Sequence, residues 1–148
     1  MTAYAAAQGV AIDVRRFGRT TRTAEDAARE IGTEVARIVK SLVFMAGGDA
    51  VVALASGPTR VDEALLAAAA GVATVRGATA DEVKVFTGYA IGGVPPFAHA
   101  TPCRVIADEA LLALDRVWAA AGLPDAVFAI APHDLVRLSG ATVARVAH

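Results

Sequence analysis

The clearest pattern of hydrophobic and polar positions lies at residues 38–44, which read Ile-Val-Lys-Ser-Leu-Val-Phe. The length of this apolar run and its β-branched residues predict a β-strand. The turn residues Gly47-Gly48-Asp49 follow, and then a second apolar run at 50–55. Two such runs on either side of a glycine turn are typical of a hairpin. We therefore expect these two runs to form an antiparallel hairpin.

The rest of the chain alternates short helical patterns with short apolar runs. Start and stop signals mark the helices: Thr23 before an acidic first turn, the capping box Thr79–Glu82, Pro132 in a first turn, and Asp108 as a cap. The predicted helices cover 24–31, 61–70, 80–87, 108–114 and 132–138. The further predicted strands cover 72–75, 103–107, 126–130 and 143–146, while 117–121 fits a helix or a strand.

This alternation of short helices with hairpin-compatible strands predicts a mixed α/β or α+β fold and argues against a doubly wound one. The chain has 148 residues, of which 55% are hydrophobic. A chain of this length and apolar content can bury a substantial core. We expect residues 1–148 to form a single domain.

Composition and charge exclude several classes of protein. Cys103 is the one cysteine, and the three histidines, His99, His133 and His148, lie far apart in sequence, so we expect no disulfide, no metal site and no cofactor. A net charge of −1 disfavours a protein that coats nucleic acid. Apolar stretches are too short to span a bilayer, and no export signal is recognisable at the N-terminus, so we expect no membrane partner and a cytoplasmic location.

Lys40 is the most unusual residue of the first strand. The chain contains twelve arginines and two lysines, and one of those lysines stands inside an apolar run. With a period of two, Lys40 shares a strand face with Ile38 and Leu42, which cannot solvate an ammonium group. Two interpretations stay open: the side chain reaches water along its stem, or it meets an anion or polar ligand. Ser41 points to the opposite face and has no paired histidine motif, which argues against a nucleophile.

A second unusual segment runs from Gly88 to Phe97. Gly92-Gly93 permits close approach of the backbone to a ligand, and Pro95-Pro96 stiffens the chain directly afterwards. We expect a rigid, exposed loop whose free amides, at Gly92, Gly93, Val94 and Phe97, could receive a carbonyl oxygen as it gains negative charge. A plain structural turn is the alternative. The glycine spacing matches no phosphate-binding fingerprint.

A small basic segment lies near the N-terminus. Arg15, Arg16, Arg19 and Arg22 fall within eight residues that contain no acid. Such a patch could hold the phosphates at the end of an RNA, and it could equally be a solvated charge run.

Several strings taken together resemble the YbaK/EbsC family of free-standing aminoacyl-tRNA deacylases, which are related to the editing domain of bacterial prolyl-tRNA synthetases. The similarity extends from about Val10 to the C-terminus. The strings, in order, are 21–24 Thr-Arg-Thr-Ala, 38–44 as above, 87–89 Thr-Gly-Tyr, 92–97 Gly-Gly-Val-Pro-Pro-Phe and 131–141 Ala-Pro-His-Asp-Leu-Val-Arg-Leu-Ser-Gly-Ala. One departure is Ala98, where many relatives carry glycine before the histidine.

The resemblance implies a curved, barrel-like mixed sheet flanked by short helices, and it assigns 117–121 to a strand. It places the family lysine on Lys40, in a pocket beside Gly92-Gly93. We expect the amino-acid side chain to enter a small apolar site formed by Ile38, Leu42 and the loop residues Val94, Pro95, Pro96 and Phe97. His99 could line the same pocket. Asp134 is a candidate acid–base group by resemblance, although an acidic residue in the first turn of the last helix is also common.

The implied reaction is hydrolysis of the ester on a mischarged tRNA, most simply tRNAPro carrying a small amino acid such as Cys or Ala. In this view Lys40 positions the ester and the loop amides of Gly92 and Gly93 stabilise the oxyanion. The expected partners are the 3′ end of an aminoacyl-tRNA and prolyl-tRNA synthetase. The competing hypotheses are a non-catalytic module of the same fold that binds tRNA or a synthetase, and a plain nucleic-acid-binding protein, which the charge disfavours.

Overall fold

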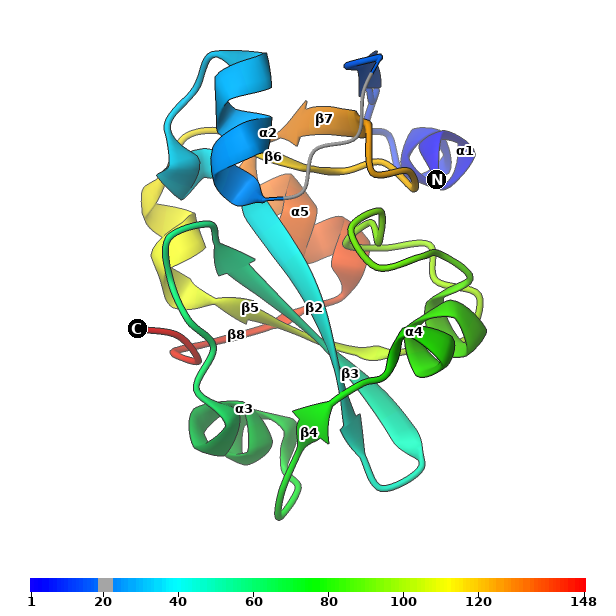
Figure 1. Cartoon of the computed structure of the whole chain (residues 1–148), viewed down its shortest axis with the longest axis vertical. Coiled ribbons are helices and arrows are strands. Elements are labelled where there is room, and N and C mark those ends of the chain that lie inside the picture. Colours follow the sequence, from blue (N-terminus) through cyan, green and yellow to red (C-terminus); the bar gives the residue numbers. More distant parts are fainter. Residues whose placement is uncertain (19–22) are drawn as a thin grey trace.

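A mixed sheet of five strands forms the centre of the molecule (Figure 1). The computed structural model describes residues 1–18 and 23–148. The strand order is β4-β2-β3-β5-β8. The hairpin of β2 (Val39–Ala46) and β3 (Asp49–Ser56) is antiparallel and in register from Val39↔Ser56 to Ala46↔Asp49. β4 (Arg76–Gly77) extends one side, and β5 (Arg104–Asp108) and β8 (Thr142–Ala144) add in parallel on the other.

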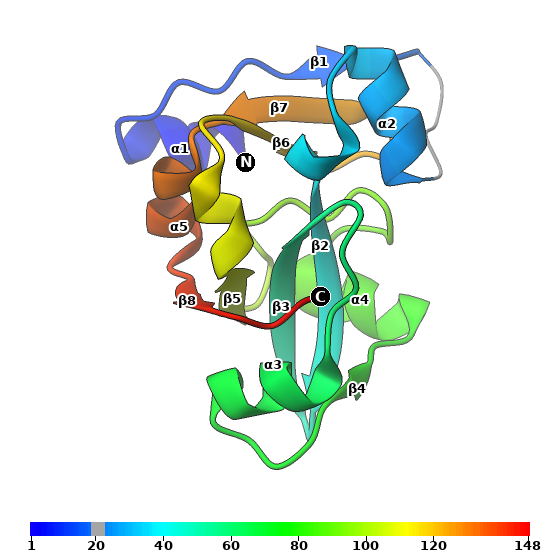
Figure 2. The same cartoon turned by 90° about the vertical axis from the view of Figure 1, so that its left-hand side faces the viewer.

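Three further strands form a separate antiparallel sheet in the order β1-β7-β6. They are β1 (Arg15–Arg16), β7 (Ala126–Ile130) and β6 (Val117–Ala120). Figure 2 shows this small sheet at one end of the molecule and helix α3 at the other. A single parallel bridge, Ile38↔Trp118, links it to the start of β2. The mixed character of the central sheet is as expected, but the strands do not close on themselves, so the barrel-like part of the expectation is not confirmed.

Three helices, α2, α4 and α5, begin where the sequence signals indicate, whereas α3 begins at Glu63, two residues later than predicted. α2 (Ala24–Ile31) starts at Thr23, whose hydroxyl accepts from the Asp26 amide, and α4 (Ala80–Thr87) starts with a complete capping box. Pro132 occupies the first turn of its helix. The remaining elements are α1 (Thr2–Ala7), α3 (Glu63–Ala70), α5 (Pro132–Ser139) and the 3-10 helices η1 (Val35–Arg37) and η2 (Glu109–Ala113).

Three expectations about elements were wrong or incomplete. Residues 72–75 form bends and extended chain, and the strand follows them at β4. The helix after Asp108 is only a 3-10 helix, and the Asp108 carboxylate caps no helix: it accepts from the amides of Val146 at 2.9 Å and Ala147 at 3.2 Å. Helix α1 and strand β1 were not predicted, because alanines and arginines without periodicity carry little local signal.

The two faces of β2 enter different hydrophobic clusters. Val39 and Val43 pack in the main core, with β6, β7 and α5. Phe44 belongs to a second cluster under α3. Ile38 packs in a third cluster, under α2. The first half of β2 therefore lies where these layers meet, and Lys40 and Ser41 point away from each other there.

Candidate functional site

Lys40 lies half-buried at the start of β2. Its ammonium donates a hydrogen bond to the main-chain carbonyl of Thr59, in the segment that follows β3. Burial lowers the pKa of Lys40 below its ordinary value, the nearby carboxylate of Glu25 opposes this effect, and Arg60 adds to it. The ammonium is therefore partly desolvated and holds one carbonyl in the described part of the chain, with further donors available to a ligand.

The two residues predicted to flank Lys40 have different surroundings. Ile38 is buried under α2 against Ala27 and Ala28, so it forms part of the core and not of an open pocket. Leu42 is 36% exposed. The strand face around Lys40 is thus closed on the Ile38 side and open on the Leu42 side.

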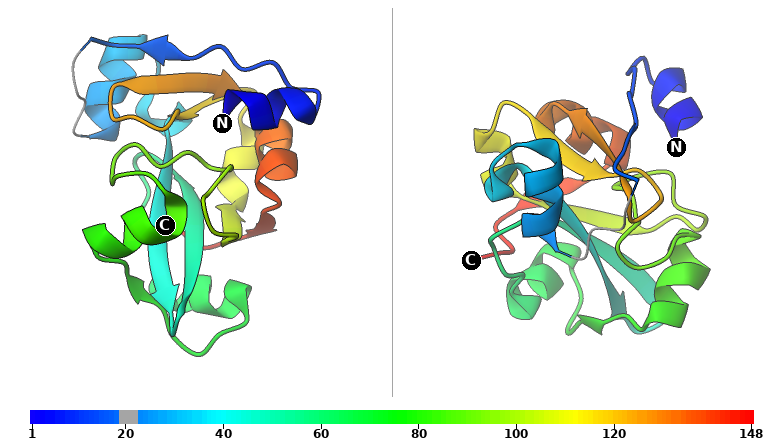
Figure 3. Two further views of the ribbon diagram at one scale, coloured as in Figure 1. Left: turned by 90° about the vertical axis from the view of Figure 1, so that its right-hand side faces the viewer. Right: turned by 45° about the horizontal axis from the view of Figure 1, so that its top comes forward.

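The glycine–proline loop connects α4 to β5. Figure 1 and the left panel of Figure 3 both draw it beside the first half of β2. Contrary to expectation, the loop is not exposed throughout: Ala90, Ile91 and Gly92 are exposed, but residues 93–97 are buried. Phe97, at 2% exposure, stacks on Tyr4 of α1 with ring centroids 5.5 Å apart. Val94 and Phe97 belong to the main core. The two prolines between them have no N–H group, so they can be buried without leaving a backbone donor unpaired.

The loop amides differ in their availability. The Gly93 N–H donates to the carbonyl of Ala90 at 3.0 Å, so one expected free donor is already used. The amides of Gly92, Val94 and Phe97 donate to no acceptor within the described ranges. Gly92, with φ +89°, is the glycine that needs positive φ, and Gly93 does not. A Cβ at Gly93 would instead meet the backbone of Gly122 and Leu123 at 3.0–3.1 Å.

Ala98 is the one non-glycine residue with positive φ (62°) in the described part of the chain. This is the position where the resemblance led us to expect glycine. The backbone therefore keeps the left-handed conformation and the alanine side chain is strained there.

His99 and Asp134, the two candidate acid–base groups, both have structural partners. His99 is half-buried, its Nε2 lies 2.7 Å from the Pro95 carbonyl oxygen, and burial lowers its pKa while that hydrogen bond opposes the shift. Asp134 forms an ion pair of 3.3 Å with Arg137 on its own helix, and Arg137 also donates to the Gln8 carbonyl at 3.0 Å. These contacts tie α5 to the end of α1.

The basic segment is only partly described. Arg15 is exposed and makes no ion pair with another described residue. Arg16 forms an ion pair of 2.8 Å with Asp125, which lies in the connection between β6 and β7. The charge of Arg16 is thus partly neutralised by an acid from a distant segment. Arg19 and Arg22 lie outside the described residues.

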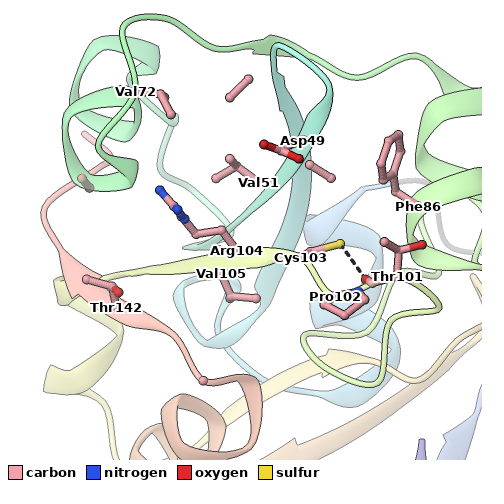
Figure 4. Close-up of a pocket in the computed structure, with 14 residues that line it drawn as sticks. Asp49, Val51, Val72, Phe86, Thr101, Pro102, Cys103, Arg104, Val105 and Thr142 are labelled. Carbon is pink, nitrogen blue, oxygen red and sulfur yellow. Dashed lines mark hydrogen bonds between the residues drawn. The ribbon is translucent and has the colours of Figure 1, made fainter.

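Two surface hollows stand out, and neither contains Lys40 or the glycine loop. One, of about 630 Å³, lies at the far end of the central sheet, where Asp49, Cys103 and Arg104 line it (Figure 4). Arg104 is held there by the carbonyl of Ala70, and Cys103 by that of Thr101 at 3.2 Å. The other, of about 510 Å³, is lined by Thr33, Arg37, Asp115, Arg116 and Trp118. Both hollows are therefore separate from the open strand face at Lys40.

Ser41 is the functional candidate that the sequence argument set aside. Its Oγ is buried and makes no hydrogen bond, which is true of no other buried side-chain oxygen or nitrogen in the ranges described. Its position next to Lys40 is the signal that the sequence offers, but strand alternation, which turns the two side chains to opposite faces, argues against it. No three metal-ligating side chains come together within residues 1–18 and 23–148. No helix described there is both long and apolar enough to cross a membrane.

Comparison with known proteins defines the class. The model of the aminoacyl-tRNA editing domain family matches residues 19–138, so the chain belongs to that family. YwhH of Bacillus subtilis, which is uncharacterised, is 34% identical over 86% of this chain and 81% of its own length. The proline–tRNA ligase of Xanthomonas campestris is 36% identical over 64% of this chain, which corresponds to 17% of the ligase. This chain thus spans about a sixth of that enzyme.

A solved structure supports the same family at the level of the fold. It is that of a protein proposed to be a trans-editing enzyme for prolyl-tRNA synthetase. The match has a TM-score of 0.87 and 44% identity, and covers 93% of this chain and 87% of the other. The predicted membership of an editing family related to the prolyl-tRNA synthetase domain is confirmed.

Proposed function

We propose that this protein is a free-standing deacylase that acts in the cytoplasm and hydrolyses the ester of a mischarged tRNA, with tRNAPro carrying a small amino acid such as Cys or Ala as the substrate. The observation that carries the proposal is Lys40, a partly desolvated cation on a strand of an editing-domain fold. Such editing answers a physical limit, because a synthetase pocket gains only ~1–3 kcal/mol per methylene and admits smaller analogues.

In the proposed reaction water attacks the acyl carbon and the bond from that carbon to the ribose oxygen breaks. The amino acid leaves with the new C–O bond, and a proton from water ends on the ribose oxygen. Lys40 positions the acceptor end, and the free amides of Gly92 and Val94 are the oxyanion donors. Gly93 no longer serves as a donor in this proposal, because its amide is bonded to Ala90.

The decisive test measures hydrolysis of tRNA charged separately with Cys, Ala, Ser, Thr and Pro by wild type and Lys40→Ala. We expect loss of roughly 100-fold or more, as for removal of one electrostatic group from an active site. Lys40→Arg should also be poor, because a guanidinium is wider and planar. Lys84→Ala is the matched control, since Lys84 is the other lysine and is exposed.

Near-normal hydrolysis by a folded Lys40→Ala protein would refute the catalytic assignment. Tight binding of charged tRNA by wild type without any turnover would instead favour the non-catalytic binding module. That alternative is supported by the absence of a clear general base: within the described chain His99 and Asp134 are both engaged in structural contacts.

The proposal includes contacts from the basic segment to the acceptor stem and cooperation with prolyl-tRNA synthetase. Changing Arg15, Arg16, Arg19 and Arg22 together to Gln should weaken tRNA binding and flatten its dependence on salt. The reason is that a protein with fewer phosphate contacts releases fewer counterions when it binds. Binding is measured by titration between 50 and 200 mM salt. An unchanged affinity and slope would show that these arginines are only solvated surface charges.

A further inference from the structure

The backbone of β2 alternates between its two neighbours. The Ala78 amide donates to the Val43 carbonyl at 3.0 Å, which puts the polar backbone groups of Val43 on the β4 side. The Gly57 amide donates to the Ile38 carbonyl at 2.7 Å, which puts those of Ile38 on the β3 side. Because this direction reverses at every residue of a strand, the N–H and C=O of Ser41 point to the β4 side.

No strand is paired with β2 on that side at Ser41 in the described ranges. β4 pairs with β2 only at Phe44 and Met45, and the chain then turns away into α4. In the other direction β6 lies close to the start of β2, but the bridge that links them is at Ile38. Ser41 thus lies between these two pairings, in a gap along the edge of β2.

The side chain of Ser41 places an unpaired group in this gap. Its Oγ is buried without a hydrogen bond. Leaving a buried hydroxyl unpaired costs on the order of 1–3 kcal/mol, so such groups are rare in folded proteins unless a ligand or water completes them. The glycine loop, with its unpaired Gly92 and Val94 amides, lies beside this half of the strand (Figures 1 and 3).

We propose that the gap at Ser41 binds the aminoacyl group of the charged tRNA as one added strand residue. In an antiparallel pair one residue offers its N–H and C=O to the C=O and N–H of the residue opposite. An aminoacyl group has the same two functions at the same separation: its α-ammonium donates to the Ser41 carbonyl, and its ester carbonyl accepts from the Ser41 amide. The Ser41 hydroxyl supplies a second acceptor to the ammonium. This inference rests on the proposed deacylase function and names the contact that positions its substrate.

The same geometry limits the side chain of the substrate. Residues opposite each other in a hydrogen-bonded pair place their side chains on one face of the sheet. On the Ser41 face the strand neighbours Val39 and Val43 are already buried in the main core. Little room remains there, so the gap accepts a side chain of about one to three heavy atoms and excludes larger ones by steric clash.

Amide hydrogen exchange of the ¹⁵N-labelled full chain tests the inference directly. The probe is 3′-deoxy-3′-(L-alanylamino)adenosine, which carries an amide in place of the ester and is not hydrolysed. In the free protein the Ser41 amide should exchange fast, while the neighbouring amides of Lys40 and Leu42, which face β3, should be slow. Saturating probe should slow the Ser41 amide at least tenfold. The propionylamino analogue, which lacks the α-amino group, should bind at least tenfold more weakly.

Binding of the probe without protection of Ser41, or a Ser41 amide already protected in the free protein, would overturn the inference. So would a wild type that hydrolyses mischarged tRNA but does not bind the probe at millimolar concentration. If wild type hydrolyses no charged tRNA at all, the proposed deacylase function fails. The contact between Ser41 and the aminoacyl group is then still tested separately, by whether the probe protects the Ser41 amide from exchange.

Ser41→Ala provides an independent readout, because the two properties it changes should move in opposite directions. Removing an unpaired buried hydroxyl should leave the melting temperature unchanged or raised. The value of kcat/KM for hydrolysis should fall at least tenfold. A variant that loses activity and stability together would assign Ser41 a structural role instead.

Discussion

Lys40 and Ser41 are adjacent in the sequence, yet they meet different surroundings. Lys40 reaches the Thr59 carbonyl on one face of β2, and Ser41 turns a buried hydroxyl to the other. The chemical oddity of Lys40, a charge in an apolar run, is visible in the sequence alone. The oddity of Ser41 is not, because serine is ordinary in a strand and only the tertiary structure shows that its hydroxyl is buried without a partner.

At Ala98 we predict that replacement by glycine stabilises the fold. A left-handed conformation costs an alanine roughly 1–2 kcal/mol, and part of the gain is lost to the greater freedom of glycine in the unfolded chain. The free energy of unfolding of Ala98→Gly, measured with urea, should therefore rise by up to about 1 kcal/mol. Ala100→Gly, at an exposed residue of ordinary φ, should lower it. A fall in both variants would mean that the Ala98 methyl contributes more by packing than it costs in strain.

At the scale of elements, the glycine–proline loop shows how a local pattern can mislead. Glycines and prolines predicted an exposed turn, but residues 93–97 are buried, since Val94 and Phe97 fill the main core. The loop is therefore fixed from beneath by packing. The loop amides without an acceptor in the described ranges are those of Gly92, Val94 and Phe97.

Helix α4, which leads into this loop, should be sensitive to acid. Hydrogen bonds from Arg76 and from the Thr79 amide lower the pKa of Glu82 from 4.5 to about 2. A carboxyl with a lower pKa in the folded state stabilises the fold above its unfolded pKa, and this contribution is lost as the pH falls from about 4.5 towards 2.

We predict that Glu82→Gln is less stable than wild type at pH 6 and that the difference shrinks as the pH falls to 3. Urea unfolding at a series of pH values measures it. In an Arg76→Gln background, the stability difference that Glu82→Gln causes at pH 6 should be smaller, because the hydrogen bond from Arg76 is the largest cause of the lowered pKa of Glu82. A stability gap that stays constant with pH would show that Glu82 acts only through packing of the helix start.

At the scale of the whole molecule, Asp108 connects the central sheet to the C-terminal segment. It is 2% exposed, and its carboxylate accepts the amides of Val146 and Ala147. That segment in turn pairs with the chain just before α3 through the bridge Val61↔Ala147. The sequence offered Asp108 only as a helix cap, since partners 38 and 39 residues away are invisible to local rules.

We predict that Asp108→Ala destabilises the protein by about 2–4 kcal/mol, because two buried amides lose their acceptor. Asp108→Asn keeps one acceptor oxygen and should cost less. Asp115→Ala, at an exposed carboxylate, is the control and should change stability much less than Asp108→Ala. Denaturant unfolding of the three variants gives the comparison. Equal effects at positions 108 and 115 would contradict the anchoring role.

Most helices and strands of this protein, and the family to which it belongs, can be recognised from local patterns in its sequence. Caps, glycine stops and apolar runs act over a few residues, so α2, α4, β2, β3 and β7 could be located from local rules, and Lys40 stood out within them. Other features depend on contacts between residues far apart in the sequence and became visible only in the folded structure. They are the division of the strands into two sheets, the burial of the loop, the acceptor role of Asp108 and the gap beside Ser41. Such features depend on which strand ends where in space, and no local pattern of residues records that.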